Sequence, residues 1–347
     1  MKRYFGIEIL RFFTSLSVLL YHYRHFFNPY NSSSELKYTS IEKSLPFHNF
    51  LEVFYNYGIF GVHVFYTISG LVFAHIYLNS AKHVSSKEFF INRFARLYPL
   101  HFATLILVLL LQYLSFFKFN IFQIIEINDF YHFMLNIFFI SSWGFEQDHS
   151  FNAPIWSVSI EIAIYIAFFF LLTFVKKYKI YAIILINIVL LLIDKTRISD
   201  SLFLECARLF FSGVFVYYIC TKNKFNTAWL IFSIILIGMS FIGNFKTFLF
   251  CPSLVILFVK IDNFITNINI KNFFILFGNL TYALYLIHLP FQIVILILFS
   301  YYNLANTIFL EHYFFVSFFV ILIFLSKLTF KFYEKPSNEI IRRKFKR

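Results

Sequence analysis

The chain has 347 residues, of which 60% are hydrophobic and 14% are charged. Soluble domains carry roughly 25% charged residues, so the composition excludes a soluble globular protein. The net charge of +13 follows the ends of apolar segments rather than one patch in a soluble domain, which argues against a nucleic-acid-binding protein.

Ten apolar segments predict helices that cross a hydrocarbon core of about 30 Å. They lie near residues 7–23, 57–78, 97–117, 155–175, 180–194, 202–220, 228–243, 247–261, 273–299 and 308–330.

Of the 30 Lys and Arg residues, 21 fall on the side of the N-terminus and seven on the other side, while Arg11 and Arg208 lie inside spans. By the positive-inside rule, both termini are expected in the cytoplasm. The predicted fold is therefore an all-α polytopic membrane protein with about ten transmembrane helices. We expect a transmembrane domain over 1–335 and a basic cytoplasmic tail over 336–347. The three cysteines show neither a disulfide framework nor metal-ligand spacing.

The first predicted helix carries polar residues on one face. At about 100° per residue, Glu8, Arg11, Ser15 and His22 fall within an arc of about 60°. Arg11 and His22 are about three turns apart, roughly 16 Å along the helix. Ionisable residues inside a membrane are costly and usually face a bundle interior or a watery cavity. The alternatives are a buried Glu–Arg pair with a capping histidine, or a polar seam that leads into a site.

The next two spans contain small residues and paired arginines. The second span carries GVHVFYTISG, in which Ser69-Gly70 suits a kink or a close backbone approach. Arg93 and Arg96 are one turn apart before the third span. From the charge pattern alone, these arginines are cytoplasmic anchors of a helix.

The segment before the fourth span is too short to cross comfortably. Residues 132–143 are therefore expected to be interfacial or re-entrant. The following sequence PIWSVSIE contains Trp156, Ser157 and Glu161, and it places a second acid inside the membrane.

The later spans hold few polar residues. Glu205 and Arg208 are three residues apart and are expected to pair with each other. In the ninth span, His288 lies seven residues after Thr281 and near the same face. The basic tail is expected to flank the last helix and to attract anionic lipid.

These elements together resemble the acyltransferase-3 family of integral membrane O-acyltransferases, over nearly the whole chain. The resemblance rests on Arg11 and His22 with ten residues between them, on Arg93-Phe-Ala-Arg96, and on GVHVFYTISG, PIWSVSIE, GNLTYALYLIH and YEKP. His63 stands where the family commonly has an acid, Tyr66 where it has Phe, and Thr281 where it has Ser.

The resemblance implies transfer of an acyl group, expected to be acetyl, from acyl-CoA to a hydroxyl of a cell-surface or lipid-linked polysaccharide such as an O-antigen or exopolysaccharide. It implies a multi-pass protein of the bacterial cytoplasmic (inner) membrane, with acetyl-CoA as co-substrate and no permanently bound cofactor or metal. His22 is then the general base, since histidine titrates near working pH, and Arg11 supports it. Arg93 and Arg96 would hold the phosphates of coenzyme A.

The remaining candidates are Glu161 and a group of possible acceptor-binding or supporting residues. By predicted depth, Glu161 lies level with His22 and is expected to position the acceptor hydroxyl or orient His22; the alternative is that it pairs with Arg11. The supporting group is Glu8, Ser69, Trp156, Ser157, Tyr282 and His288.

Two other functions stay open on the sequence. The acceptor could be peptidoglycan, a lipid or a small molecule. Alternatively, polar residues in several spans are also typical of a transporter of acyl groups or glycan precursors. Against a transporter, the polar residues concentrate in the first four spans, and inverted repeats are not evident.

Overall fold

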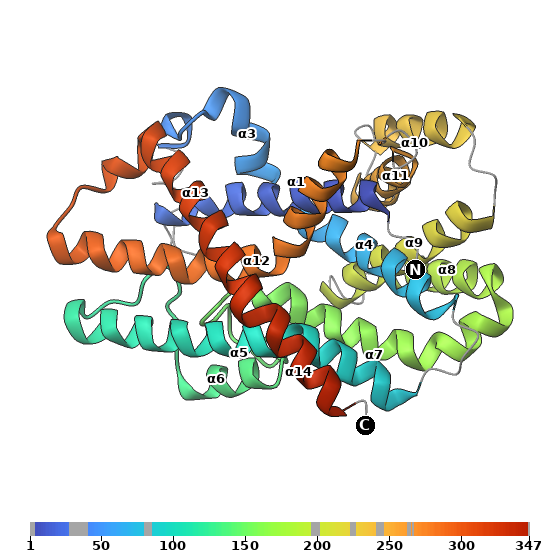
Figure 1. The fold of residues 1–347 in the computed structure, drawn as a ribbon, viewed down its shortest axis with the longest axis horizontal. Helices are drawn as coiled ribbons and strands as arrows, with labels where there is room; N and C mark the ends of the chain where they lie inside the picture. The colour runs from blue at the N-terminus through green and yellow to red at the C-terminus, as the bar shows by residue number, and fades with distance from the viewer. Residues whose placement is uncertain are drawn as a thin grey trace. The chain divides into compact units, whose positions relative to one another are not determined.

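The computed structural model describes residues 4–27, 41–79, 85–195, 202–222, 227–240, 246–261, 265 and 267–345. In these residues the chain is helical, with a single isolated β-bridge between Ile127 and Ser150 (Figure 1). The chain divides into two compact units. The first unit comprises Met1–Thr14, Ile59–Ser86 and Ile160–Asn279, and the second comprises Ser15–Gly58, Lys87–Ser159 and Leu280–Arg347. The predicted all-α membrane fold is confirmed.

A helix lies at each of the ten predicted spans. Within the described residues, seven helices are long and apolar enough to cross a membrane: α1 (Phe5–Tyr23), α4 (Phe60–Tyr77), α5 (Ser86–Phe119), α7 (Ile155–Tyr178), α9 (Leu202–Lys222), α12 (Ile268–Tyr302) and α13 (His312–Thr329). The other three are shorter: α8 (Ile180–Lys195), α10 (Thr227–Ser240) and α11 (Lys246–Ile261). α5 and α12 exceed their predicted spans, because helical hydrogen bonding continues past the apolar stretch that defines a span.

In the first unit, α4 and α9 touch through their backbones. A Cβ at Gly70 would lie 1.8 Å from the carbonyl oxygen of Phe210, and one at Gly213 would lie 2.0 Å from that of Thr67. Each helix therefore contributes a glycine where the other presents a carbonyl. This is the close packing expected from small residues in membrane helices.

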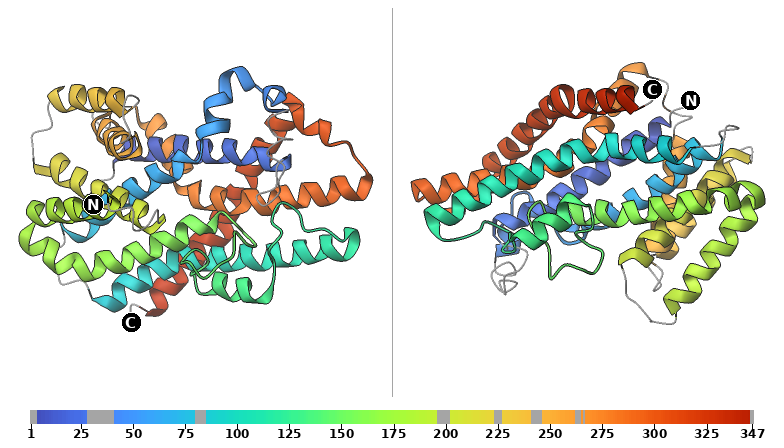
Figure 2. Two further views of the ribbon diagram at one scale, coloured as in Figure 1. Left: turned by 180° about the vertical axis from the view of Figure 1, so that it is seen from behind. Right: turned by 90° about the horizontal axis from the view of Figure 1, so that it is seen from below.

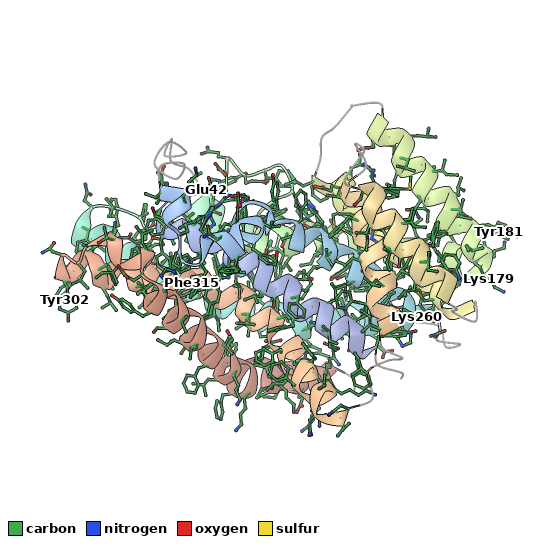
Figure 3. All side chains as sticks on the ribbon, turned by 90° about the horizontal axis from the view of Figure 1, so that it is seen from above. Glu42, Lys179, Tyr181, Lys260, Tyr302 and Phe315 are labelled. Atoms are coloured by element: carbon green, nitrogen blue, oxygen red, sulfur yellow. The ribbon has the colours of Figure 1, made fainter. Side chains whose placement is uncertain are left out.

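The predicted pairing of Glu205 with Arg208 is wrong. Glu205 Oε1 lies 3.3 Å from His63 Nε2 on α4, while Arg208 pairs with Asp194 at the end of α8. Spacing along one helix could not reveal these partners, because both come from neighbouring helices. The turn that joins α7 to α8 is tight, with Lys179 in the left-handed region (φ 53°) and Tyr181 close beside it (Figure 3).

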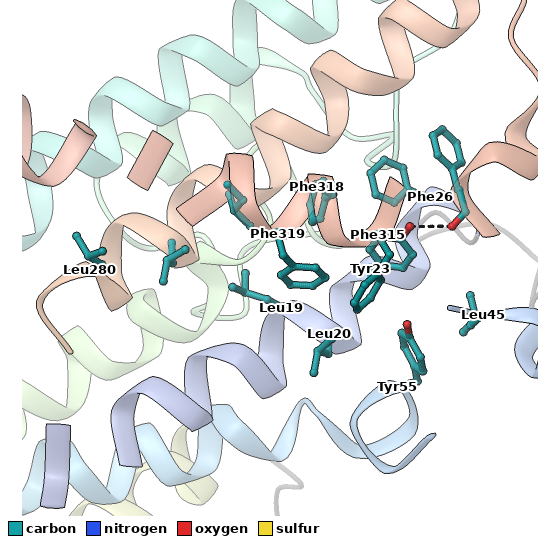
Figure 4. Packing of buried hydrophobic residues seen from close by; sticks show 13 residues of the cluster. Leu19, Leu20, Tyr23, Phe26, Leu45, Tyr55, Leu280, Phe315, Phe318 and Phe319 are labelled. Carbon is teal, nitrogen blue, oxygen red and sulfur yellow. Dashed lines mark hydrogen bonds between the residues drawn. The ribbon is translucent and has the colours of Figure 1, made fainter. Parts of the chain in front are cut away.

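In the second unit, the end of α1 packs into an aromatic core. Tyr23 and Phe26 contact Phe315 and Phe318 of α13 with ring centroids 5.0 to 5.7 Å apart (Figure 4). The Tyr23 hydroxyl donates to the carbonyl of Phe309 at 2.7 Å, which satisfies the one polar atom of this buried ring. The core anchors the end of α1 that carries His22.

The segment between α5 and α7 contains α6 (Phe130–Ile137), which lies beside α5 in Figure 1. Eight residues rise only about 12 Å, so this segment does not span a membrane. Asp129 caps α6 by accepting from the backbone N–H of His132 at 2.9 Å, and its carboxylate also contacts His132 Nδ1 at 2.7 Å. Burial raises the pKa of Asp129, but these hydrogen bonds outweigh it and lower the pKa below 3.8.

The C-terminal residues continue as a helix. After α13, one π-helical turn over Phe330–Glu334 leads into α14 (Lys335–Phe345), and the three run as one rod (Figure 2). The predicted basic tail is therefore helical through residue 345, the last described residue.

Candidate active site

The centre of the site is a pair of buried histidines from α1 and α12. His22 and His288 are each 1% exposed. His22 Nδ1 lies 2.7 Å from His288 Nε2, and the two rings stack with centroids 4.8 Å apart. The structure thus brings together two sequence-predicted residues that are 266 positions apart.

The hydrogen bonds of the pair assign its protons. His288 Nδ1 lies 3.3 Å from the carbonyl oxygen of Leu284. A carbonyl can only accept, so Nδ1 of His288 carries the proton and its Nε2 carries a lone pair. That lone pair accepts the proton on His22 Nδ1. His22 Nε2 is then left as a basic lone pair, which is the form a general base requires.

The backbone of His22 is held by the same helix. Gln292, one turn after His288, donates from Nε2 to the His22 carbonyl at 2.9 Å. His22 lies in the last turn of α1. α12 therefore positions both the ring and the main chain of His22. Sequence reasoning missed Gln292, although its four-residue distance from His288 places both on one face.

The first turn of α7 is bonded to α12. Ser157 Oγ lies 2.8 Å from the Tyr285 hydroxyl, which donates to the carbonyl of Pro154 at 2.7 Å. The Trp156 ring lies 6.1 Å from that of His149. Ser157 is thus brought to the helix that carries His288, while Trp156 lies against His149.

His149 is a further histidine that the sequence did not single out. It lies in the loop before α7 and, like His25, interacts electrostatically with His22. Burial lowers the pKa of His149, while Asp148 and Glu146 act in the opposite direction. The lowered pKa favours the neutral form of this ring at neutral pH.

The predicted donor-binding arginines lie in the first turns of α5, before its apolar stretch. Arg93 is half-buried and Arg96 is exposed. Two tyrosines bond the backbone of the following turn: Tyr282 donates to the carbonyl of Leu97 at 2.7 Å and Tyr333 to that of Pro99 at 3.1 Å. Tyr282 and the YEKP element therefore hold the helix that presents the arginines.

The other sequence-predicted residues belong to the first unit. Arg11 Nη1 lies 3.2 Å from Glu8 Oε2, and the Glu8 side chain packs against Gly278. Arg11 thus forms an ion pair with Glu8, as one of the two readings of α1 expected. Ser69 and Glu161 are half-buried on α4 and α7. No group of three His, Cys, Asp or Glu side chains among the described residues could hold a metal ion.

Comparison with known proteins identifies the class. The family described as "Acyltransferase domain" matches residues 4–330, which is most of the chain. Together with the helical membrane fold, this match defines a membrane acyltransferase. The chain belongs to the acyltransferase-3 family. Neither the curated proteins nor the solved structures give a match.

Proposed function

We propose that the protein is an O-acyltransferase of the bacterial cytoplasmic membrane that moves an acetyl group from acetyl-CoA to a hydroxyl of a cell-surface or lipid-linked polysaccharide. The observation that carries this proposal is the oriented pair of His22 and His288. A base with a defined lone pair is what transfer from a thioester to a hydroxyl needs.

The reaction follows from that orientation. His22 Nε2 takes the proton of the acceptor hydroxyl as its oxygen attacks the thioester carbonyl. The tetrahedral intermediate then expels the thiolate of coenzyme A, which takes the proton back from His22 Nε2. The products are an O-acetyl ester and coenzyme A, and the histidine pair returns to its starting form.

His288 stabilises the positive charge that His22 carries as an imidazolium. When His22 holds the extra proton, its Nδ1–H donates to the lone pair of His288 Nε2, which stabilises the cation. Arg93 and Arg96 would bind the donor's phosphates from the cytoplasm, where acetyl-CoA is made, since guanidinium groups bind phosphate by paired hydrogen bonds. Glu161 is proposed to position the acceptor hydroxyl.

The test uses the purified protein in detergent with acetyl-CoA and measures release of coenzyme A with and without glycan acceptor. His22→Ala should lower turnover by about 10²- to 10⁴-fold, the contribution typical of a general base. The matched control is His312→Ala, which removes an imidazole from the N-terminal residue of α13. If His22→Ala keeps near wild-type turnover, the histidine is structural and this mechanism is wrong.

The acceptor is identified by comparing the mass of surface glycans from wild-type and deletion cells. Each transferred acetyl group adds about 42 Da to its acceptor. Loss of these increments from the polysaccharide of deletion cells would support a polysaccharide acceptor. Loss of the same increments from peptidoglycan, lipid or a small molecule would instead assign the enzyme to that acceptor.

A further inference from the structure

A proline interrupts the helix that positions the histidine pair. Pro290 lies inside α12, two residues after His288. Proline has no backbone N–H, so the carbonyl four residues earlier loses its helical partner. That carbonyl belongs to Leu286. Leu286 and Pro290 are both buried, and at membrane depth an unpaired carbonyl has no water to replace the missing donor.

Asn152 supplies a donor to this carbonyl. Its Nδ2 lies 3.0 Å from the Leu286 carbonyl oxygen and 3.0 Å from Thr104 Oγ1 on α5. The Thr104 hydroxyl donates to the Leu100 carbonyl at 3.0 Å, so its oxygen is available to accept from Asn152. Because a carbonyl only accepts, the amide orientation is defined. Asn152 is 0% exposed and uses both N–H groups of its amide in these two bonds.

The repaired carbonyl lies in the turn that carries His288. Leu284 accepts from the His288 ring, and Leu286 comes two residues later on the same turn of α12. A shift of this turn would move the His288 ring away from His22 Nδ1. We propose that Asn152 is a positioning residue: its amide replaces the N–H that Pro290 lacks and thereby holds His288 against His22.

The catalytic consequence of this assignment rests on the proposed function. The bond between Asn152 and the Leu286 carbonyl makes a separate prediction, that a second substitution repairs the loss of Asn152. Asn152→Ala leaves the Leu286 carbonyl without a donor. Pro290→Ala restores a backbone N–H at position 290, which can bond Leu286 without help. The damage from Asn152→Ala should therefore be repaired in the Asn152→Ala/Pro290→Ala double variant, and Pro290→Ala alone should be tolerated.

The matched control is Asn136→Ala. Asn136 is also 0% exposed, and its amide donates to the His132 carbonyl and to Ser150 Oγ, each at 2.9 Å. Neither partner adjoins the proline, so Pro290→Ala should not rescue Asn136→Ala. This control separates a specific repair of the Leu286 bond from a general stabilisation of α12.

The first readout is kinetic. Asn152→Ala should lower kcat about a hundredfold, the cost of misplacing a reacting group by roughly 1 Å, with KM for acetyl-CoA unchanged; the double variant should recover most of kcat. If Asn152→Ala does not fold, recovery of the folded protein in the double variant supports the same assignment. A double variant as damaged as Asn152→Ala, or rescue of Asn136→Ala as well, would overturn it.

The second readout does not depend on acyl transfer. In protein labelled with ¹⁵N-histidine, the His288 signals should show a protonated Nδ1 and an unprotonated, hydrogen-bonded Nε2. Asn152→Ala should abolish this pattern and the double variant should restore it. If the wild type shows the pattern and its rescue but transfers no acetyl group, the positioning role stands and the proposed function fails. An unchanged His288 spectrum in folded Asn152→Ala overturns the positioning role.

Discussion

His288 meets His22 through the ring nitrogen that carries no proton, and this decides which substitutions the pair should tolerate. In His288→Gln, the side-chain oxygen can still accept from His22 Nδ1. In His288→Leu, the shape is roughly kept but the acceptor is lost, so His22 can turn or change tautomer. Removing a partner that orients a functional histidine typically costs about 10- to 100-fold.

We therefore expect kcat to order as wild type, then His288→Gln, then His288→Leu, with thermal unfolding midpoints in detergent as the control for folding. Equal activity of the Gln and Leu variants would show that acceptance of the His22 proton is unimportant. That result would show that His288 does not orient His22 and that it serves only in packing.

At this scale the sequence predicts single residues better than their partners. An imidazole within an apolar helix or at its end is conspicuous, and both His22 and His288 were predicted. Their pairing depends on the crossing of α1 and α12, which no local pattern contains. Asn152, in the loop before α7, was not predictable at all, because its role exists only through the carbonyl that Pro290 leaves without a donor in α12.

At the scale of single helices, α5 presents the candidate donor site. We predict that Arg93→Ala/Arg96→Ala weakens binding of coenzyme A, measured by calorimetry, and that Lys at both positions rescues only partly, because an ammonium cannot make paired contacts with one phosphate. Lys87→Ala is the control, since it removes an exposed positive charge from the same helix. Equal affinities for the double variant and the Lys87 variant would leave these arginines as membrane anchors.

The crossing of α4 and α9 supplies a test of packing. Gly70→Ala places a Cβ 1.8 Å from a carbonyl oxygen, so the helices must separate, and overpacking of this kind costs about 1–3 kcal/mol or more. Gly238→Ala in α10 meets nothing within 4 Å and should be neutral or stabilising by up to about 1 kcal/mol. Thermal unfolding in detergent compares the two; a Gly70 variant as stable as the Gly238 variant would contradict the backbone contact.

Helix positions were predictable because a membrane demands a long apolar segment, and each of the ten predicted segments contains a helix. Lengths were less predictable. Hydropathy indicates where the lipid-facing stretch ends, but a helix can continue beyond that point through its backbone hydrogen bonds. α5 therefore begins at Ser86 rather than near residue 97. The helical conformation of α6 was not predicted, because it is supported by side-chain bonds such as that between Asp129 and His132.

For the whole molecule, sidedness is the remaining prediction. In a variant whose own cysteines are replaced, single cysteines at Lys43 and Gln147 should react with a membrane-impermeant reagent on intact cells, and one at Lys87 should not. All three native residues are exposed, so a lack of reaction reports membrane side rather than burial. Labelling of position 87 from outside would reverse the proposed donor and acceptor sides.

The contact between α4 and α9 also bears on how the protein is made. α4 ends at Tyr77 and α9 begins at Leu202, so about 125 residues leave the ribosome between them. At about 5–20 residues per second, α4 therefore enters the bilayer several seconds before α9, the helix that packs against Gly70, has been synthesised. During that interval His63 has no Glu205 beside it. The first unit can therefore close only after α9 is inserted, and until then Gly70 of α4 lacks its contact with the Phe210 backbone.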